Sequence, residues 1–138
     1  MKGISFFLYF AFIFAFGAVA DETGEYMAKF GVESHIKNGT IKYFIYDTRD
    51  NFMNDTSPYR TGTLKPDSGA GISITFGAHN KKNRDYAVKV HHDVNDNGII
   101  DEGDLCGYSN NVPHWDGAKF NTGNNSFESN IKFNPCLK

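Results

Sequence analysis

The sequence predicts an all-β protein, a single antiparallel β-sandwich of about seven short strands. Short runs in which apolar and polar residues alternate recur along the chain, as expected of strands with one buried face. Clusters of Asn, Gly, Asp and Pro separate these runs, and no stretch has a convincing 3.6-residue apolar period over two helical turns. Residues 21–138 are enough for one domain with one modest core.

The segment 1–20 has the features of a secretory signal peptide. A single early cation, Lys2, precedes the apolar run 4–16. Ala18 and Ala20 then form a small-x-small cleavage site. A transmembrane anchor is the alternative, but the apolar run is shorter than the roughly 20 residues that span a bilayer. The sequence therefore predicts a secreted protein, periplasmic or at the cell surface in a bacterium, with no membrane span after cleavage.

The charge of the chain bears on its partners. The formal net charge is −2 at pH 7, so neither nucleic acid nor an anionic membrane surface is an expected partner. An extracellular protein or a glycan is the expected partner class, and the protein is expected to be a monomer. Three Asn-x-Ser/Thr sequons are candidate glycosylation sites in a eukaryotic host, at Asn38, Asn54 and Asn124.

The two cysteines, Cys106 and Cys136, are expected to form a disulfide because an even pair in an oxidising compartment is most simply paired. A closed loop of about 30 residues contributes on the order of 3 kcal/mol when the geometry is unstrained. Two unpaired thiols are the alternative. Metal binding by the pair is less expected, since the residues are far apart and no Cys-x-x-Cys occurs.

Two strands joined by a tight turn are expected in the first half of the domain. Residues 32–37 alternate between apolar and polar, the period of a half-buried strand. Asn38-Gly39 follows directly and predicts a β-hairpin. The second strand, 40–46, is rich in β-branched and aromatic residues.

A long polar connection and two further strands follow. Residues 47–66 have room for one short edge strand or a helical turn near Phe52. Residues 71–76 alternate Ile, Ile and Phe with small or polar neighbours and predict a strand with one buried face. Residues 86–92 predict another strand, which runs directly into an acidic loop.

The last part of the chain is expected to contain more irregular structure. Residues 107–117 have few apolar side chains, and Trp115 is expected to cover an edge of the core. Residues 118–120 start a short strand, and 126–133 alternate again as the last strand. The tyrosines at 26, 59 and 108 are expected to cover the core as well, although they could form an aromatic face for a ligand.

The loop 93–104 has the ligand order of a 12-residue calcium loop. Oxygen-bearing side chains occupy loop positions 1, 3, 5, 9 and 12, Gly98 stands at position 6, and position 7 offers a carbonyl. Asp replaces the usual bidentate Glu at position 12, which predicts a weaker Ca²⁺ site. The alternative is a metal-free turn in which the same side chains bond backbone amides. The predicted ligands are Asp93, Asn95, Asn97, Ile99 through its carbonyl, Asp101 and Asp104.

His91 and His92 are candidate functional groups beside this loop. Neighbours on a strand point to opposite faces, so the two rings cannot serve one site from that strand. Neutral structural histidines are expected, and one ring is expected to pack against residues 107–111. The second hypothesis is a secreted hydrolase of unknown type in which His92 and nearby carboxylates act as general acid and base. No Ser/His/Asp order or His-Glu-x-x-His motif supports it.

A set of motif positions runs from the strand before the acidic loop to the segment after it: Tyr86, Ala87, His92, Asp93, Asn95, Asn97, Gly98, Asp101, Gly107, Tyr108, Ser109, Asn110 and Asn111. In these positions the chain resembles the secreted proteins grouped as domain of unknown function 2141. The resemblance implies a prealbumin-like or immunoglobulin-like β-sandwich without established catalytic activity. The link between Asp101 and Gly107 is shorter than in the family pattern, and the cysteine pair is not a family hallmark.

The leading hypothesis is therefore a secreted, non-enzymatic β-sandwich with one structural calcium-binding loop. Such a protein would act as a binding or surface-interaction module.

Overall fold

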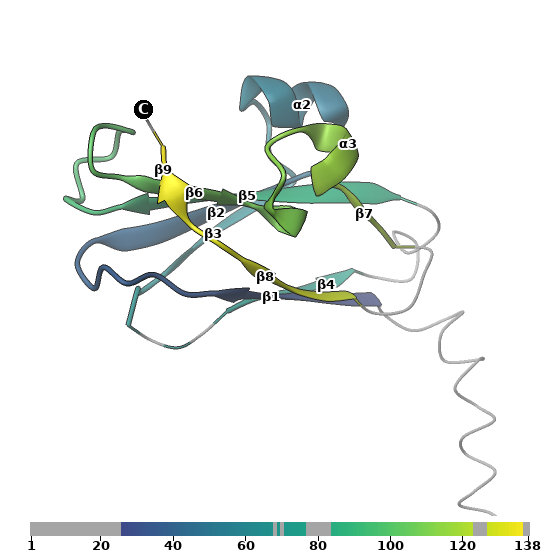
Figure 1. Ribbon diagram of the computed structural model, residues 1–138. Helices are drawn as coiled ribbons and strands as arrows, with labels where there is room; N and C mark the ends of the chain where they lie inside the picture. The colour runs from purple at the N-terminus through teal and green to yellow at the C-terminus, as the bar shows by residue number, and fades with distance from the viewer. Residues whose placement is uncertain (1–25, 68, 70, 77–83, 123–126, 137–138) are drawn as a thin grey trace, which may run out of the picture.

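The computed structural model describes residues 26–67, 69, 71–76, 84–122 and 127–136, and it confirms a β-sandwich. A three-stranded sheet has the order β4-β1-β8, and a six-stranded sheet has the order β3-β2-β5-β6-β9 with β7 beside β5. Figure 1 shows the two sheets as layers, with two short helices over the outer face of the larger one. The strands are β1 Tyr26–Val32, β2 Thr40–Tyr46, β3 Arg60–Leu64, β4 Ile72–Phe76, β5 Asp85–Asp93, β6 Leu105–Tyr108, β7 Phe120–Asn121, β8 Phe127–Ile131 and β9 Asn134–Pro135.

The smaller sheet is built on β1. Its even-numbered residues, all apolar, are buried, while Lys29 and Gly31 face outward, which is the period of a strand with one buried face. β1 pairs antiparallel with β4 but parallel with β8. The antiparallel expectation therefore holds for the other pairs of the described strands and not for this one. Sequence alternation carries no information on strand direction.

The larger sheet is centred on β5. Its neighbours are β2 on one side and β6 on the other, both antiparallel. Every second side chain of β5 points into the space between the sheets, and the core there consists of aliphatic and aromatic residues from both layers. Phe30 and Phe127 of the smaller sheet contact Phe120 of β7, beside β5, at ring-centroid distances of 5.4 and 5.3 Å. These aromatic pairs hold the two layers together.

The outer face of the larger sheet carries a second, smaller core under α2 (Arg49–Asn54) and α3 (Trp115–Ala118). Phe52 is fully buried there and meets the Trp115 ring edge-on at 5.8 Å, so Trp115 covers a core edge as expected. α2 begins at Thr48, whose hydroxyl accepts the Asn51 N–H, a favourable N-cap. The connection 47–66 thus contains both the predicted helical turn and the predicted edge strand, β3.

The hairpin predicted at Asn38-Gly39 is wrong. Residues 33–39 are not a strand, and the segments on either side of them, β1 and β2, lie in different sheets. Asn38 and Gly39 lie instead in the connection that passes from the smaller sheet to the larger one. Gly39 has a φ of 85°, and a Cβ there would lie 2.1 Å from the Asp93 carbonyl oxygen, so only glycine fits this close passage.

The region 107–117, expected to be irregular, begins instead with the end of β6 and a 3₁₀ turn (Ser109–Asn111), and α3 starts within it. β6 was missed because only Leu105 and Gly107 of its short run face the core. The predicted strand 118–120 is reduced to β7, and the last strand ends at Ile131 rather than 133. Among the described residues, no helix has the length and apolar character to cross a membrane.

The disulfide between Cys106 and Cys136 is present, with a Cα–Cα distance of 4.9 Å. It joins β6 to the end of the chain just past β9, where the Cys136 N–H also donates to the Asp104 carbonyl oxygen at 3.0 Å. β9 is only two residues long, so two ladder positions alone would hold this strand weakly. The covalent bond therefore secures the edge of the larger sheet beside the acidic loop.

Replacing both cysteines by serine should lower the free energy of unfolding by about 2–4 kcal/mol, because the unfolded chain regains the freedom of a closed loop of about 30 residues. Urea denaturation of the oxidised protein and of the Cys106→Ser/Cys136→Ser double variant measures this difference. Reduced wild-type protein is the matched control and should resemble the double variant. Equal denaturation midpoints for all three samples would contradict the prediction.

Candidate metal centre

The loop 93–104 connects β5 to β6, and its two ends are carboxylates held in the protein interior. Asp93 ends β5 and Asp104 directly precedes β6, and each is 1% exposed. The pairing of His92 with Leu105 brings these ends together, so the loop closes on a fixed base. Two like charges that are this close and this buried require compensating groups.

Asp93 is surrounded by hydrogen-bond donors. One of its carboxylate oxygens accepts the Asn97 N–H at 3.2 Å, and the other accepts the Gly98 N–H at 2.8 Å and the Lys42 ammonium at 3.4 Å. Burial by itself raises the pKa of the Asp93 carboxyl, but these donors and the Lys42 charge outweigh it, so the pKa lies below its usual value. Asp93 is therefore an anion around which the first half of the loop folds.

Asp104 organises the second half in the same way. It accepts the Val94 N–H at 3.0 Å, the Asp101 N–H at 3.2 Å and a hydrogen bond from His91 Nε2 at 2.8 Å. Burial raises the pKa of Asp104, but the His91 hydrogen bond and the two backbone donors together lower it below its usual value. Both ends of the loop thus carry negative charge.

The middle of the loop turns its polar side chains onto one another. Asn95 Oδ1 accepts the Asn97 N–H at 3.3 Å, and Asn97 Oδ1 accepts the Ile99 N–H at 3.1 Å. Both side-chain amides also donate to Asp101 Oδ2. The remaining oxygen, Asp101 Oδ1, is buried and has no hydrogen-bond partner among the described residues. An anionic oxygen in that position is costly unless a cation or water meets it.

These contacts decide between the two interpretations of the loop only in part. The hydrogen bonds to backbone amides are those of a metal-free turn. Each carbonyl or carboxylate oxygen retains further lone pairs, however, so the same oxygens can also bind an ion. The unpartnered Asp101 oxygen fits a cation site and is not satisfied by the turn. The Ile99 side chain is 62% exposed, so this residue faces solvent.

The family described as an uncharacterized protein conserved in bacteria (DUF2141) matches residues 32–130. The chain belongs to this family. No curated protein and no solved structure matches it. The match covers β2 to β7, most of β8 and the whole acidic loop, but only the last residue of β1 and none of β9.

The segment Ser109-Asn110-Asn111, part of the DUF2141 resemblance, forms hydrogen bonds to β5 and to the end of β8. Ser109 Oγ accepts the Val88 N–H at 2.9 Å and donates to the Ala118 carbonyl oxygen at 2.7 Å. Asn111 Oδ1 accepts the Lys132 N–H at 2.8 Å. Asn110 and Asn111 both have a positive φ, 57° and 59°, which asparagine tolerates better than most residues. These side chains therefore close the backbone of a tight bend.

The two histidines of the DUF2141 chain lie on opposite faces of β5, as predicted, but neither ring bonds residues 107–111. His91 points outward and forms a hydrogen bond with Asp104. Together, His91, Asp93 and Asp104 form a buried group whose potential ligand atoms all lie within 4.8 Å of one another. The sequence placed His91 beside the loop but did not identify it as the hydrogen-bond partner of Asp104. The available signal was the position of His91 on the strand that enters the loop, two residues before Asp93 and therefore on the same face of the strand.

His92 points inward and is fully buried. Its Nε2 donates to the Asn38 carbonyl oxygen at 2.6 Å, and its Nδ1 forms a hydrogen bond with the Ser34 hydroxyl at 2.8 Å. Ser34 is itself 2% exposed, so this Ser–His pair is closed to a substrate. His92 ties the crossing between the two sheets to β5, a structural role that gives no support to the hydrolase hypothesis.

The stability of this DUF2141 chain in a calcium chelator should be lost in acid. The folded-state pKa values of Asp93 and Asp104 are lowered, so both carboxylates contribute stability above the unfolded-state pKa of about 3.9. That contribution is lost as the pH falls through the folded-state pKa values. We expect urea midpoints to fall steeply below about pH 4.

A matched pair of variants tests the assignment. Asp96→Asn, at an exposed loop position, should follow the wild-type acid curve. Asp104→Asn should be less stable at neutral pH and show a shallower loss in acid, because one of the two responsible carboxylates is gone. A wild-type midpoint that rises on acidification below about pH 4 would contradict the assignment.

Proposed function

We propose that this protein is a secreted, non-enzymatic binding module whose loop 93–104 binds one Ca²⁺ as a structural ion. The observation that carries the proposal is that Asp101 Oδ1, within the loop, is buried and has no hydrogen-bond partner among the described residues. A bound cation supplies the missing partner. The ion would be held by Asp93, Asn95, Asn97, Asp101 and Asp104 through side-chain oxygens and by Ile99 through its carbonyl.

The chemistry of the donors favours calcium over other metals. The ligand set is all oxygen, which suits a hard cation. Mg²⁺ prefers near-ideal octahedral geometry with several retained waters, whereas a 12-residue loop offers a larger and more flexible cage. His91 serves as an orienting group, because its hydrogen bond to Asp104 Oδ2 fixes the carboxylate at the last loop position.

The ion would act on stability rather than on chemistry. The loop carboxylates of Asp93 and Asp104 come close together, and a divalent cation relieves their repulsion. Both ring nitrogens of His92 form hydrogen bonds inside the protein. His92 is therefore not available as the general base that the hydrolase hypothesis requires. A structural ion in a binding module is therefore the function best supported.

Secretion is supported by two independent features of the chain. The N-terminal segment, which lies outside the described residues, has the pattern of a cleavable signal. The disulfide is the kind of bond that persists in an oxidising compartment. Of the glycosylation candidates, Asn38 and Asn54 have exposed positions that a glycan could occupy, and Asn124 lies outside the described residues.

Calcium should raise the melting temperature of the oxidised protein. Ca²⁺ at 100 times its dissociation constant stabilises a folded protein by about 2.7 kcal/mol, which corresponds to roughly 10 °C for a domain of this size. Differential scanning fluorimetry in EGTA and in millimolar Ca²⁺ measures the shift, and Mg²⁺ at the same concentration should give a smaller one.

Two variants in the loop make the test specific. Asp101→Asn removes the charge of the unpartnered oxygen at nearly constant shape and should lose most of the calcium-dependent shift. Asp96→Asn removes an equal charge outside the proposed ligand set and should keep it. Identical wild-type melting curves with and without Ca²⁺ would refute the calcium site and leave a hydrogen-bonded turn.

Expression in a secreting host should release a chain that begins at Asp21, since the small-x-small site ends at Ala20. Intact-mass spectrometry of the culture medium measures the cleavage position and any glycan in the same experiment. Replacing Ala18 and Ala20 by bulky residues should leave the chain uncleaved. A full-length protein retained in the cytoplasm would contradict the secretion proposal.

A further inference from the structure

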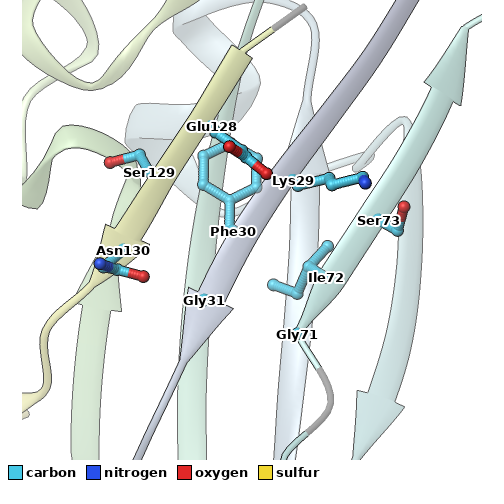
Figure 2. Close-up of a pocket in the computed structure, with 9 residues that line it drawn as sticks. All are labelled: Lys29, Phe30, Gly31, Gly71, Ile72, Ser73, Glu128, Ser129 and Asn130. Carbon is cyan, nitrogen blue, oxygen red and sulfur yellow. The ribbon is translucent and has the colours of Figure 1, made fainter.

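The two outer faces of the sandwich differ in what they offer a ligand. Figure 2 shows the outer side of β8, β1 and β4, an open groove in which Lys29 stands beside Glu128 and Ser73. It carries one lysine and one glutamate, and the aromatic residue in its lining, Phe30, is only 1% exposed. The outer face of the six-stranded sheet has a groove of a different character, between α2 and the calcium loop.

This second groove, which we call the loop groove, has a volume of about 400 Å³. Its floor consists of outward-facing side chains on three neighbouring strands in two cross-strand rows. The first row is Lys42, His91 and Cys106, and the second is Phe44, Lys89 and Tyr108. Asp55 and Pro58 border it on the α2 side, and Gly98 and Ile100 border it on the loop side.

The apolar part of the loop groove is aromatic. Phe44 and Tyr108 are only partly buried against the second core, and Tyr46 contributes a third ring. Ile100 is 52% exposed on the loop wall, an unusual position for a large aliphatic side chain in a polar loop. Aromatic walls with a few convergent polar groups are typical of small-molecule sites.

The charged part of the loop groove has two lysines, Lys42 and Lys89, and one carboxylate, Asp55, and both ammonium groups are held in place. The Lys89 ammonium lies 4.6 Å from the Phe52 ring centroid and 5.6 Å from that of Tyr46. Its ion-pair partner Asp55, at 2.7 Å, is 69% exposed, so solvent weakens this pair. Lys89 is therefore fixed by aromatic contacts and by an ion pair to an exposed carboxylate, and an anionic ligand can compete for that pair.

The second cation, Lys42, is linked to the calcium loop. Its ammonium is 3.4 Å from Asp93 Oδ2, and Asp93 occupies the first ligand position. A Ca²⁺ ion that binds Asp93 takes over this counter-charge and repels the ammonium. Lys42 is 32% exposed and can turn from the loop toward the groove that it lines.

We propose that the loop groove binds a small molecule with an aromatic body and one anionic group, and that Ca²⁺ in the neighbouring loop strengthens this binding. The aromatic body packs against Phe44 and Tyr108, and the anionic group contacts the Lys89 and Lys42 ammonium groups. The coupling rests on the calcium site proposed above, because it is the ion that frees Lys42 from Asp93.

Two fluorescent probes that differ only in charge test the ligand class. 8-Anilinonaphthalene-1-sulfonate carries a sulfonate on an aromatic frame, and N-phenyl-1-naphthylamine is the same frame without it. Fluorescence titration of the oxidised, folded protein in saturating Ca²⁺ should give one sulfonate probe per chain, bound about tenfold more tightly than the neutral probe. In EGTA the affinity for the sulfonate probe should fall about tenfold.

Single-charge variants assign the effect to the groove. Lys42→Met should abolish the difference between Ca²⁺ and EGTA while the protein still responds to Ca²⁺ in melting. Lys89→Met should weaken the sulfonate probe under both conditions and leave the neutral probe unchanged. Lys132→Met, at an exposed position outside the groove, is the matched control and should behave as wild type. Melting curves confirm that each variant is folded.

The outcomes separate this inference from the calcium proposal. A melting temperature that rises with Ca²⁺, combined with equal probe affinities in Ca²⁺ and EGTA or equal affinities for the two probes, overturns the inference and leaves the ion site intact. A melting temperature that does not respond to Ca²⁺ overturns the ion site and the coupling together. Sedimentation that shows a dimer dispersed by Lys89→Met would assign the groove to a second copy of the chain and also overturn the inference.

Discussion

The buried carboxylates of Asp93 and Asp104 are the constraint on which the rest of this structure depends. Strand pairing brings them to the base of one loop, and each is 1% exposed. Buried anions persist only when donors or cations surround them. The donors here are backbone N–H groups of the loop itself together with Lys42 and His91. The loop therefore adopts a conformation in which its own N–H groups stabilise the two carboxylates that strand pairing buries.

β5 transmits this constraint to both layers. Its outward side chains, Lys89 and His91, face the helices and the loop, whereas His92 faces inward and bonds the crossing from β1 to β2. One strand thus fixes the loop base, the loop groove and the connection between the sheets. Because Lys42 lines the groove and pairs with Asp93 of the loop, a change in charge at Asp93 acts directly on Lys42. No rearrangement of the core is needed.

Much of the fold was predictable because strand alternation is a local signal. Residues 40–46, 71–76 and 86–92 each show it and each became a strand. Pairing partners and strand direction are not local, so the parallel pairing of β1 with β8 had no signature in the sequence. The Asn38-Gly39 turn shows the same limit. Its residues correctly marked a sharp bend, but whether that bend joins neighbours or crosses between sheets depends on where β1 is buried.

The candidate site shows the complementary pattern. Its candidate oxygen ligands follow a fixed spacing, so they could be identified from the sequence. Lys42 and His91 reach the loop only because β2 and β5 pair in a particular register, which the sequence does not specify locally. These two residues would set the selectivity of the proposed ion site. A metal that prefers nitrogen would have to take His91 away from Asp104, at the loss of a 2.8 Å bond to a buried anion. A hard cation leaves that bond in place and needs only to displace the Lys42 ammonium, whose 3.4 Å contact with Asp93 is longer and partly solvated. The surroundings of the loop, as well as its ligand spacing, therefore favour an oxygen-seeking ion.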